Sequence, residues 1–246
     1  MDAIRPHDAL SRGAYGAGEA LRLINFQRAG AAHRKATERR KVSRSTVVRW
    51  LYGYRHAGGR SQPLWRPDYV PTDREAALEV SFRDLIELRF VKAFRDAGLS
   101  LQTIRECFGR AVEAVHDERP FSTLKFRTDG KTIFSSITRD IREGEFVDLK
   151  RRQNVFYSFV EPSLHDLEFD ATSLARWFPL GMSRKSIVID PERAFGRPIV
   201  DSGGMPTETI YRAVSVEGSP ERVAKLYELP IAAVRDAVAF QKQLAA

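Results

Sequence analysis

Three serines, each followed by a segment with helical spacing of its apolar residues, constrain the fold of this chain most strongly. Ser43, Ser100 and Ser219 stand where a side-chain oxygen can accept a hydrogen bond from an amide of the first helical turn. Pro220 follows Ser219 at the first helical position, where its missing amide would have no partner in any case. This repeated capping predicts a chain that is mainly helical.

The spacing of apolar residues places the helices along the chain. Val47, Trp50 and Leu51 fall on one face of the helix that follows Ser43. Cys107 falls on the apolar face of a later helix, so we expect a packed core residue rather than a nucleophile. The predicted helices cover residues 18–24, 43–54, 82–97, 101–115, 207–216, 220–227 and 230–244.

The residues between these helices favour short strands. Asp129-Gly130, a dipeptide typical of two-residue turns, separates residues 123–128 from residues 131–134 and predicts a hairpin there. Further short strands are expected at 146–149, 155–160, 167–169 and 187–189. The predicted fold class is therefore α+β, mainly α with small β elements.

The chain is expected to contain two domains. Residues 170–183, which include the sequence Arg-Trp-Phe-Pro, are interpreted as a linker or packing segment, and this places a boundary near residue 180. The larger unit, 1–180, would carry DNA-binding helices with a β extension. The smaller unit, 181–246, ends in three predicted helices whose order is that of a helix-turn-helix, and a protein-interaction role is expected for it.

The basic charge of the chain is concentrated near its N-terminus. The formal net charge of +8 divides into +7 for residues 1–80, +3 for residues 81–160 and −2 for residues 161–246. Because binding to a nucleic acid releases counterions condensed on the phosphates, such a basic segment predicts a polyanionic partner. A solvated basic surface without a partner is the alternative.

The helix after Ser43 is the better candidate for reading DNA. If its apolar face packs inward, the polar and basic residues near its start face solvent, as they do in a recognition helix. The candidate DNA-binding residues are Arg39, Arg40, Lys41, Ser43, Arg44, Ser45, Thr46 and Arg49.

The last predicted helix carries a second apolar stripe that includes Phe240 and Leu244. One stripe must pack on its own module, whereas the second can face either a partner protein or the rest of the chain. These two residues are the candidate partner-binding residues, and the sequence leaves the two alternatives open.

Composition and motifs argue against several other classes of protein. The five histidines are scattered, and Gly203-Gly204 lacks the Lys-Ser/Thr of a phosphate-binding loop, so we predict neither an enzyme nor a metal or cofactor site. A single cysteine excludes an intrachain disulfide and fits a reducing compartment. Because no apolar run reaches the ~18 residues of a membrane span, we expect no membrane contact and a cytoplasmic location.

Two stretches resemble known families. Residues 18–54 together with 81–105 resemble the MerR-like winged helix-turn-helix. Residues 190–198, followed by Ser219-Pro220-Glu221 and the Val223-Ala224-Tyr227 helix, resemble the domain of unknown function 433. The long basic connection at 27–41 departs from the first pattern, because a MerR-like pair of helices has a tight turn there.

The combination resembles the large VapB-type antitoxins of type II toxin–antitoxin pairs. That resemblance implies a repressor of its own operon that also neutralises a PIN-domain ribonuclease toxin encoded nearby. Its expected partners are operator DNA, this toxin and a second copy of the chain, so a homodimer or a hetero-oligomer with the toxin is expected. The alternative function is a free-standing MerR-like regulator whose C-terminal module dimerises or senses a ligand.

Overall fold

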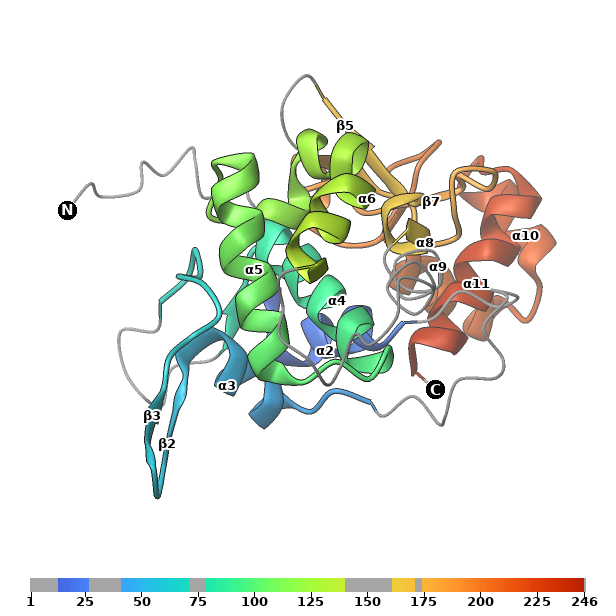
Figure 1. Ribbon diagram of the computed structural model, residues 1–246. Coiled ribbons are helices and arrows are strands. Elements are labelled where there is room, and N and C mark those ends of the chain that lie inside the picture. The colour runs from blue at the N-terminus through green and yellow to red at the C-terminus, as the bar shows by residue number, and fades with distance from the viewer. Residues whose placement is uncertain (1–12, 27–40, 71–77, 140–160, 171–173, 246) are drawn as a thin grey trace.

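A computed structural model describes residues 13–26, 41–70, 78–139, 161–170 and 174–245 (Figure 1). The chain is mixed but mainly helical, with small antiparallel sheets of two strands each, as the predicted α+β class requires. The three serine caps are confirmed: the hydroxyl oxygens of Ser43, Ser100 and Ser219 accept hydrogen bonds from the amides of Thr46, Thr103 and Arg222. These caps fix where three of the helices begin.

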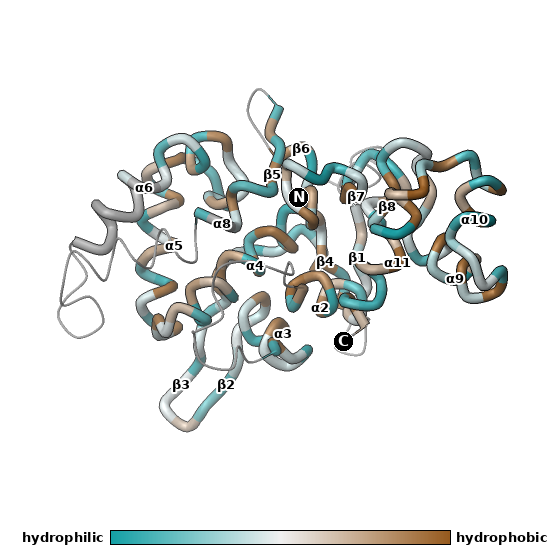
Figure 2. The backbone as a smooth tube through the Cα atoms, turned by 90° about the vertical axis from the view of Figure 1, so that its right-hand side faces the viewer, coloured by the Kyte–Doolittle hydropathy of each residue, from teal (hydrophilic) through white to brown (hydrophobic). Residues whose placement is uncertain are grey.

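The N-terminal part of the fold is a group of helices with two small sheets. In chain order it comprises β1 (Tyr15–Gly16), α2 (Ala17–Asn25), α3 (Arg44–Tyr52), β2 (Tyr54–His56), β3 (Gly59–Ser61), β4 (Glu79–Val80), α4 (Phe82–Asp96) and α5 (Leu101–Val115). β1 pairs with β4, and β2 pairs with β3. Apolar stretches of α2, α4 and β4 lie beside one another at the centre (Figure 2).

Asp84 joins the start of α4 to the chain that follows β3. Its carboxylate accepts hydrogen bonds from Trp65 Nε1 at 2.8 Å, from the Asp68 amide at 2.8 Å and from Arg119 Nε at 2.7 Å. Burial disfavours the charged guanidinium of Arg119, but Asp84 and Asp68 outweigh this effect and raise the pKa of Arg119. Three segments far apart in sequence are thus held by one buried carboxylate.

The predicted hairpin around Asp129-Gly130 is wrong, because α6 (Leu124–Arg139) runs through both residues. Thr123 caps this helix, with its hydroxyl oxygen 3.1 Å from the Phe126 amide. Phe126 packs against Phe121 of the short 3₁₀ helix η1 (Pro120–Ser122), their ring centroids 4.9 Å apart. Tertiary packing of Phe126 and a capped start outweigh the local turn preference of Asp-Gly.

The middle of the chain contains α8 (Glu161–Leu164) and a small sheet of β5 (Leu167–Phe169) and β6 (Leu174–Trp177). The strand expected at 167–169 is confirmed, whereas those expected at 146–149 and 155–160 lie outside the described residues. Part of the expected linker at 170–183 is instead strand β6.

The C-terminal part contains β7 (Ile187–Val188), the 3₁₀ helix η3 (Ala194–Gly196), β8 (Ile199–Val200), α9 (Thr207–Glu217), α10 (Pro220–Leu226) and α11 (Ile231–Ala245). The three predicted helices of this module are confirmed. They lie together at the end of the molecule opposite the β2–β3 hairpin (Figure 1).

Direct contacts connect the C-terminal part to the rest of the chain. Trp177 and Ile189 exchange two main-chain hydrogen bonds of 2.9 and 2.8 Å across the expected boundary near residue 180. The buried Tyr15 hydroxyl donates to the Gly196 carbonyl at 2.8 Å. Within the rest of the chain, buried Asp166 accepts hydrogen bonds from Trp177 Nε1 and from the guanidinium of Arg89, and so joins β6 to α4. One continuous core therefore extends through both parts.

Glu87 of α4 gives the fold a pH dependence. Its buried carboxyl lies 2.9 Å from the Ser122 amide, and desolvation by burial raises its pKa to about 8 despite that hydrogen bond and nearby Arg83. A raised folded-state pKa contributes stability that is fully present below the unfolded value and is lost as pH rises through about 8.

We therefore expect the stability difference between Glu87→Gln and the native protein to grow in favour of the variant as pH rises. The slope should be up to ~1.4 kcal/mol per pH unit between the unfolded and folded pKa values. Chemical denaturation at pH 5, 7 and 9 measures it. Parallel stability curves of the two proteins would contradict the assignment.

Candidate nucleic-acid interface

The long connection between α2 and α3 begins and ends at one point. The side-chain amide of Asn25 donates to the Val42 carbonyl at 2.9 Å, and its oxygen accepts from the Val42 amide at 2.7 Å. Asn25 is the last residue of α2, and Val42 directly precedes the Ser43 cap of α3. The last residue of α2 is therefore bonded directly to the residue that precedes the cap of α3.

α3 presents a polar, basic surface at its start. Its buried face consists of Val47, Trp50 and Leu51, as predicted. On the opposite side Arg44, Ser45 and Arg49 are exposed and Thr46 is half-buried. The hydroxyl of Ser43 lies 2.9 Å from that of Ser45 and 3.0 Å from that of Thr46, so the three hydroxyls form one cluster at the helix N-terminus.

A tight turn at Gly53 connects α3 to the β2–β3 hairpin. Gly53 has φ +71°, and a Cβ there would lie 2.3 Å from the Ser61 carbonyl oxygen, so only glycine fits. The Leu64 amide donates to the Trp50 carbonyl at 2.8 Å and returns the chain to α3. Ala57-Gly58 forms the turn of this hairpin, between His56 and Gly59.

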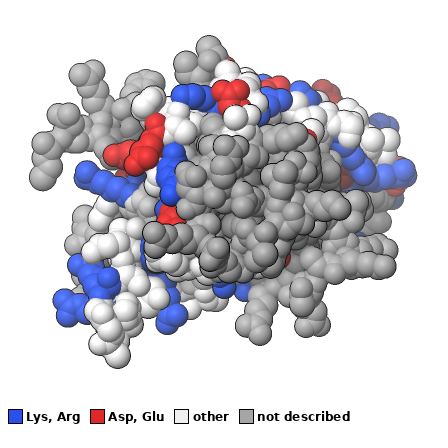
Figure 3. Space-filling view, in the orientation of Figure 1, with Lys and Arg blue, Asp and Glu red and all other residues white. Residues whose placement is uncertain are grey.

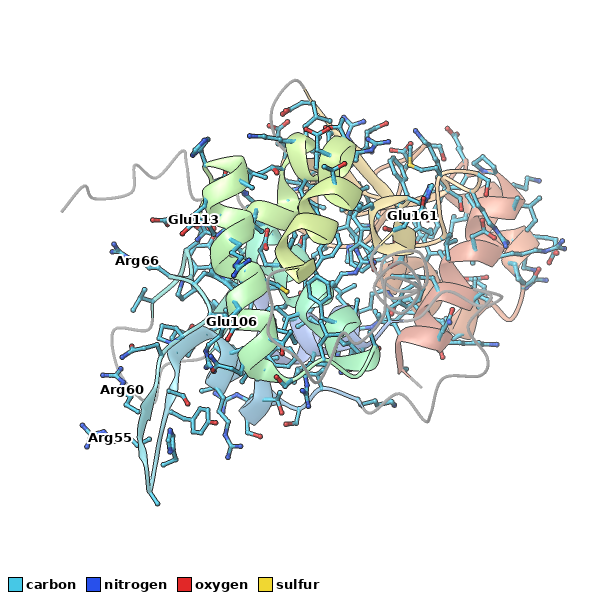
Figure 4. All side chains as sticks on the ribbon, in the orientation of Figure 1. Arg55, Arg60, Arg66, Glu106, Glu113 and Glu161 are labelled. Carbon is cyan, nitrogen blue, oxygen red and sulfur yellow. The ribbon has the colours of Figure 1, made fainter. Side chains whose placement is uncertain are left out.

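The hairpin carries two arginines that the sequence analysis did not single out. Arg55 and Arg60 stand directly opposite each other on β2 and β3, and both are exposed. Neither side chain has an ion pair or hydrogen bond within the described part of the chain. Figure 4 shows both pointing away from the body, with Arg66 further along the same side.

Acidic residues are missing from this stretch of sequence. Residues 39–67 contain eight Lys/Arg and no Asp or Glu. In Figure 3 the basic side chains at the projecting hairpin have no acidic ones among them. We call Arg44, Ser45, Arg49, Arg55 and Arg60 the α3–hairpin surface. Its cations are not neutralised from within the described chain, which is the electrostatic condition for binding a polyanion.

Aromatic rings on the hairpin adjoin these cations. The Arg49 guanidinium lies over the Tyr54 ring at 5.4 Å, and Tyr54 and His56 have ring centroids 5.6 Å apart. A pocket of about 350 Å³ opens at the junction of α3 and the hairpin, lined by Tyr52, Gly53, Tyr54, Arg55 and Arg60. Arg105 of α5 donates to the Gln62 carbonyl at 2.9 Å and fixes the end of the hairpin.

The other predicted site residues divide into two groups. Arg39 and Arg40 lie outside the described residues, whereas Lys41 is described and exposed. Phe240 is fully buried, and Leu244 is 8% exposed. The Phe240 ring packs against Phe26 after α2, centroid to centroid 4.9 Å, because the second stripe of α11 faces the body of this chain. Of the two alternatives that the sequence left open, the structure shows this stripe packed on the chain's own body.

The described residues hold no group of three or more His, Cys, Asp or Glu side chains placed to bind a metal ion. In the same part of the chain, no helix combines the length and the apolar character that crossing a membrane requires.

One protein-family model matches the C-terminal part of the chain. Residues 187–240, from β7 to α11, match the family described as a protein of unknown function, DUF433. This confirms the C-terminal resemblance.

The fold as a whole is similar to the crystal structure of Rv2018 from Mycobacterium tuberculosis. The TM-score is 0.66 at 20% sequence identity, over 91% of this chain and 96% of that chain. This likeness shows a shared fold. No curated protein matches the chain.

Replacing both hairpin arginines, Arg55→Ala with Arg60→Ala, should weaken binding to heparin, a generic polyanion, without lowering the melting temperature. Like charges directly opposite in a hairpin destabilise it by ~0.2–1 kcal/mol, so their removal is neutral or stabilising. Elution from heparin at lower salt, measured beside thermal unfolding, checks this.

The matched control is Arg222→Ala with Lys225→Ala on α10, which removes the same charge from exposed positions in the C-terminal module. If both double variants elute at the same salt, net charge and not the α3–hairpin surface governs polyanion binding.

Proposed function

We propose that the chain is the antitoxin of a type II toxin–antitoxin pair, which represses its own operon through the α3–hairpin surface and neutralises a PIN-domain ribonuclease through its C-terminal module. The observation that carries the DNA-binding half is the group of exposed arginines on a capped helix and the adjoining hairpin, which no acidic side chain of the described residues neutralises. The toxin-binding half rests on the VapB-type resemblance, of which the DUF433 match at 187–240 supports the C-terminal part.

In this proposal α2 and α3 are a helix-turn-helix and β2–β3 is its wing. The start of α3 would enter the major groove, where Arg44 can bind the guanine edge and Ser45 and Thr46 can bond to several bases. Arg55 and Arg60 would contact backbone phosphates, which position the protein without reading sequence. A dimer would place two such units on two half-sites of an operator.

A second candidate function is a MerR-like regulator that acts without a toxin. The burial of Phe240 and Leu244 favours it, because α11 packs on α2 and leaves neither residue for a toxin. The C-terminal module would then serve dimerisation or ligand sensing. The presence or absence of a co-purifying neighbour separates the two candidates.

Arg44→Ala with Arg49→Ala should weaken binding to the duplex upstream of the chain's own reading frame by ~10-fold or more and leave the melting temperature unchanged. Each good Arg–guanine pair contributes ~1–3 kcal/mol, and both side chains are exposed in the free protein. Fluorescence anisotropy measures the affinity. Unchanged binding by this double variant would show that α3 does not contact DNA.

Co-expression with the product of the neighbouring reading frame tests the toxin half. We expect the two proteins to co-purify and the neighbour's ribonuclease activity to be suppressed. Val216 and Leu226 are large apolar side chains that the C-terminal module leaves 83% and 63% exposed. Val216→Asp with Leu226→Asp should weaken the complex, whereas Val70→Asp, at a 58% exposed position elsewhere, should not. A neighbour that never co-purifies would favour the second candidate.

A further inference from the structure

The side chain of Asn25 joins α2 to the residue before the α3 cap. We propose that Asn25 is a positioning residue for DNA sequence recognition: it sets the start of α3 and so determines where Arg44, Ser45 and Thr46 meet the bases. This inference rests on the proposed DNA-binding function, and it assigns a role to a residue outside the α3–hairpin surface.

The two hydrogen bonds between Asn25 and Val42 require a carboxamide side chain. Asn25 donates through Nδ2 to the Val42 carbonyl and accepts through Oδ1 from the Val42 amide, at 2.9 and 2.7 Å. Only Asn and Gln offer a neutral donor and acceptor side by side. An aspartate would keep the acceptor and turn its second oxygen toward the Val42 carbonyl, while an alanine would lose both bonds.

The Asn25–Val42 contact lies at the start of α3, where a small movement has the largest effect on base recognition. Val42 is followed directly by the Ser43 cap, whose hydroxyl oxygen lies 3.3 Å from the Thr46 amide. The apolar face of α3 is packed independently through Val47, Trp50 and Leu51. Loss of the Asn25 contact therefore leaves the helix docked but releases its first turn, and base contacts need geometry held to within ~0.5 Å.

The length of the connection makes this contact necessary. Sixteen residues, 26–41, separate Asn25 from Val42. The restraint that a chain places on its two ends weakens as the number of residues between them grows, so sixteen residues restrain these ends less than a short turn would. The two Asn25 hydrogen bonds supply that restraint.

The test compares the native protein with Asn25→Ala and Asn25→Asp on two duplexes: the sequence upstream of its own reading frame and a shuffled duplex of the same composition. We expect Asn25→Ala to bind the upstream duplex ~10-fold more weakly, with Asn25→Asp between the two and affinity for the shuffled duplex unchanged. The control is Ser219→Ala, which removes the cap of α10 and should leave both affinities unaltered. Native affinity of Asn25→Ala for the upstream duplex would overturn the proposal, as would equal loss on both duplexes.

Amide hydrogen exchange of the same variants tests, without DNA, whether Asn25 positions the start of α3. The amides of Thr46 and Val47 should exchange faster in Asn25→Ala, while amides in α10 keep native protection. If the native protein does not distinguish the duplexes, the proposed function fails and exchange still reports whether Asn25 positions α3. If the alanine variant does not fold, Asn25→Asp carries both measurements. Native protection of Thr46 and Val47 in a folded Asn25 variant would contradict the positioning role.

Discussion

The buried carboxylate of Asp84 is the interaction on which the arrangement of the N-terminal part depends. It accepts from Trp65, from the Asp68 amide and from Arg119, and its side chain is 1% exposed. Removing one partner of such a buried pair leaves the other charge uncompensated, which typically destabilises a protein by ~3–5 kcal/mol. Because Trp65 and Asp68 follow the β2–β3 hairpin, Asp84 holds the returning chain to α4 and gives the hairpin a fixed base.

Because the base of the hairpin is fixed, the arginines of the α3–hairpin surface are held in defined positions relative to one another. Contacts to phosphates alone position a protein on DNA without reading its sequence. Here Gly53 sets the angle between α3 and the hairpin. Arg105 of α5 donates a hydrogen bond to the Gln62 carbonyl. Asn25 bonds to Val42 and so joins the end of α2 to the residue before the α3 cap. The arginines of the α3–hairpin surface, which no acidic side chain in the described part of the chain neutralises, project from this framework. The C-terminal module carries little net charge and shares the core through Tyr15 and Phe240, so it contributes to the same folded body.

The parts of the structure that depend on local signals could be predicted from the sequence. Ser43, Ser100 and Ser219 cap helices as expected, and Val47, Trp50 and Leu51 are buried. The hairpin predicted at Asp129-Gly130 is wrong, because packing of Phe126 on Phe121 stabilises a helix there and outweighs a two-residue turn preference. The Asn25–Val42 contact and the packing of Phe240 on Phe26 join residues far apart in sequence, and no local sequence pattern predicts these contacts. Arg55 and Arg60 became candidates only when the strand register placed them opposite each other.

The central claim is that the exposed cations of the α3–hairpin surface bind DNA, with Arg55 and Arg60 on its phosphates. The most direct measurement is the salt dependence of affinity for the duplex upstream of the chain's own reading frame. Each neutralised phosphate contributes about −0.9 to the slope of log K against log salt, so the two phosphate contacts of Arg55 and Arg60 predict a slope of about −2 per protomer. A slope near zero, or no binding at low salt, would contradict the account.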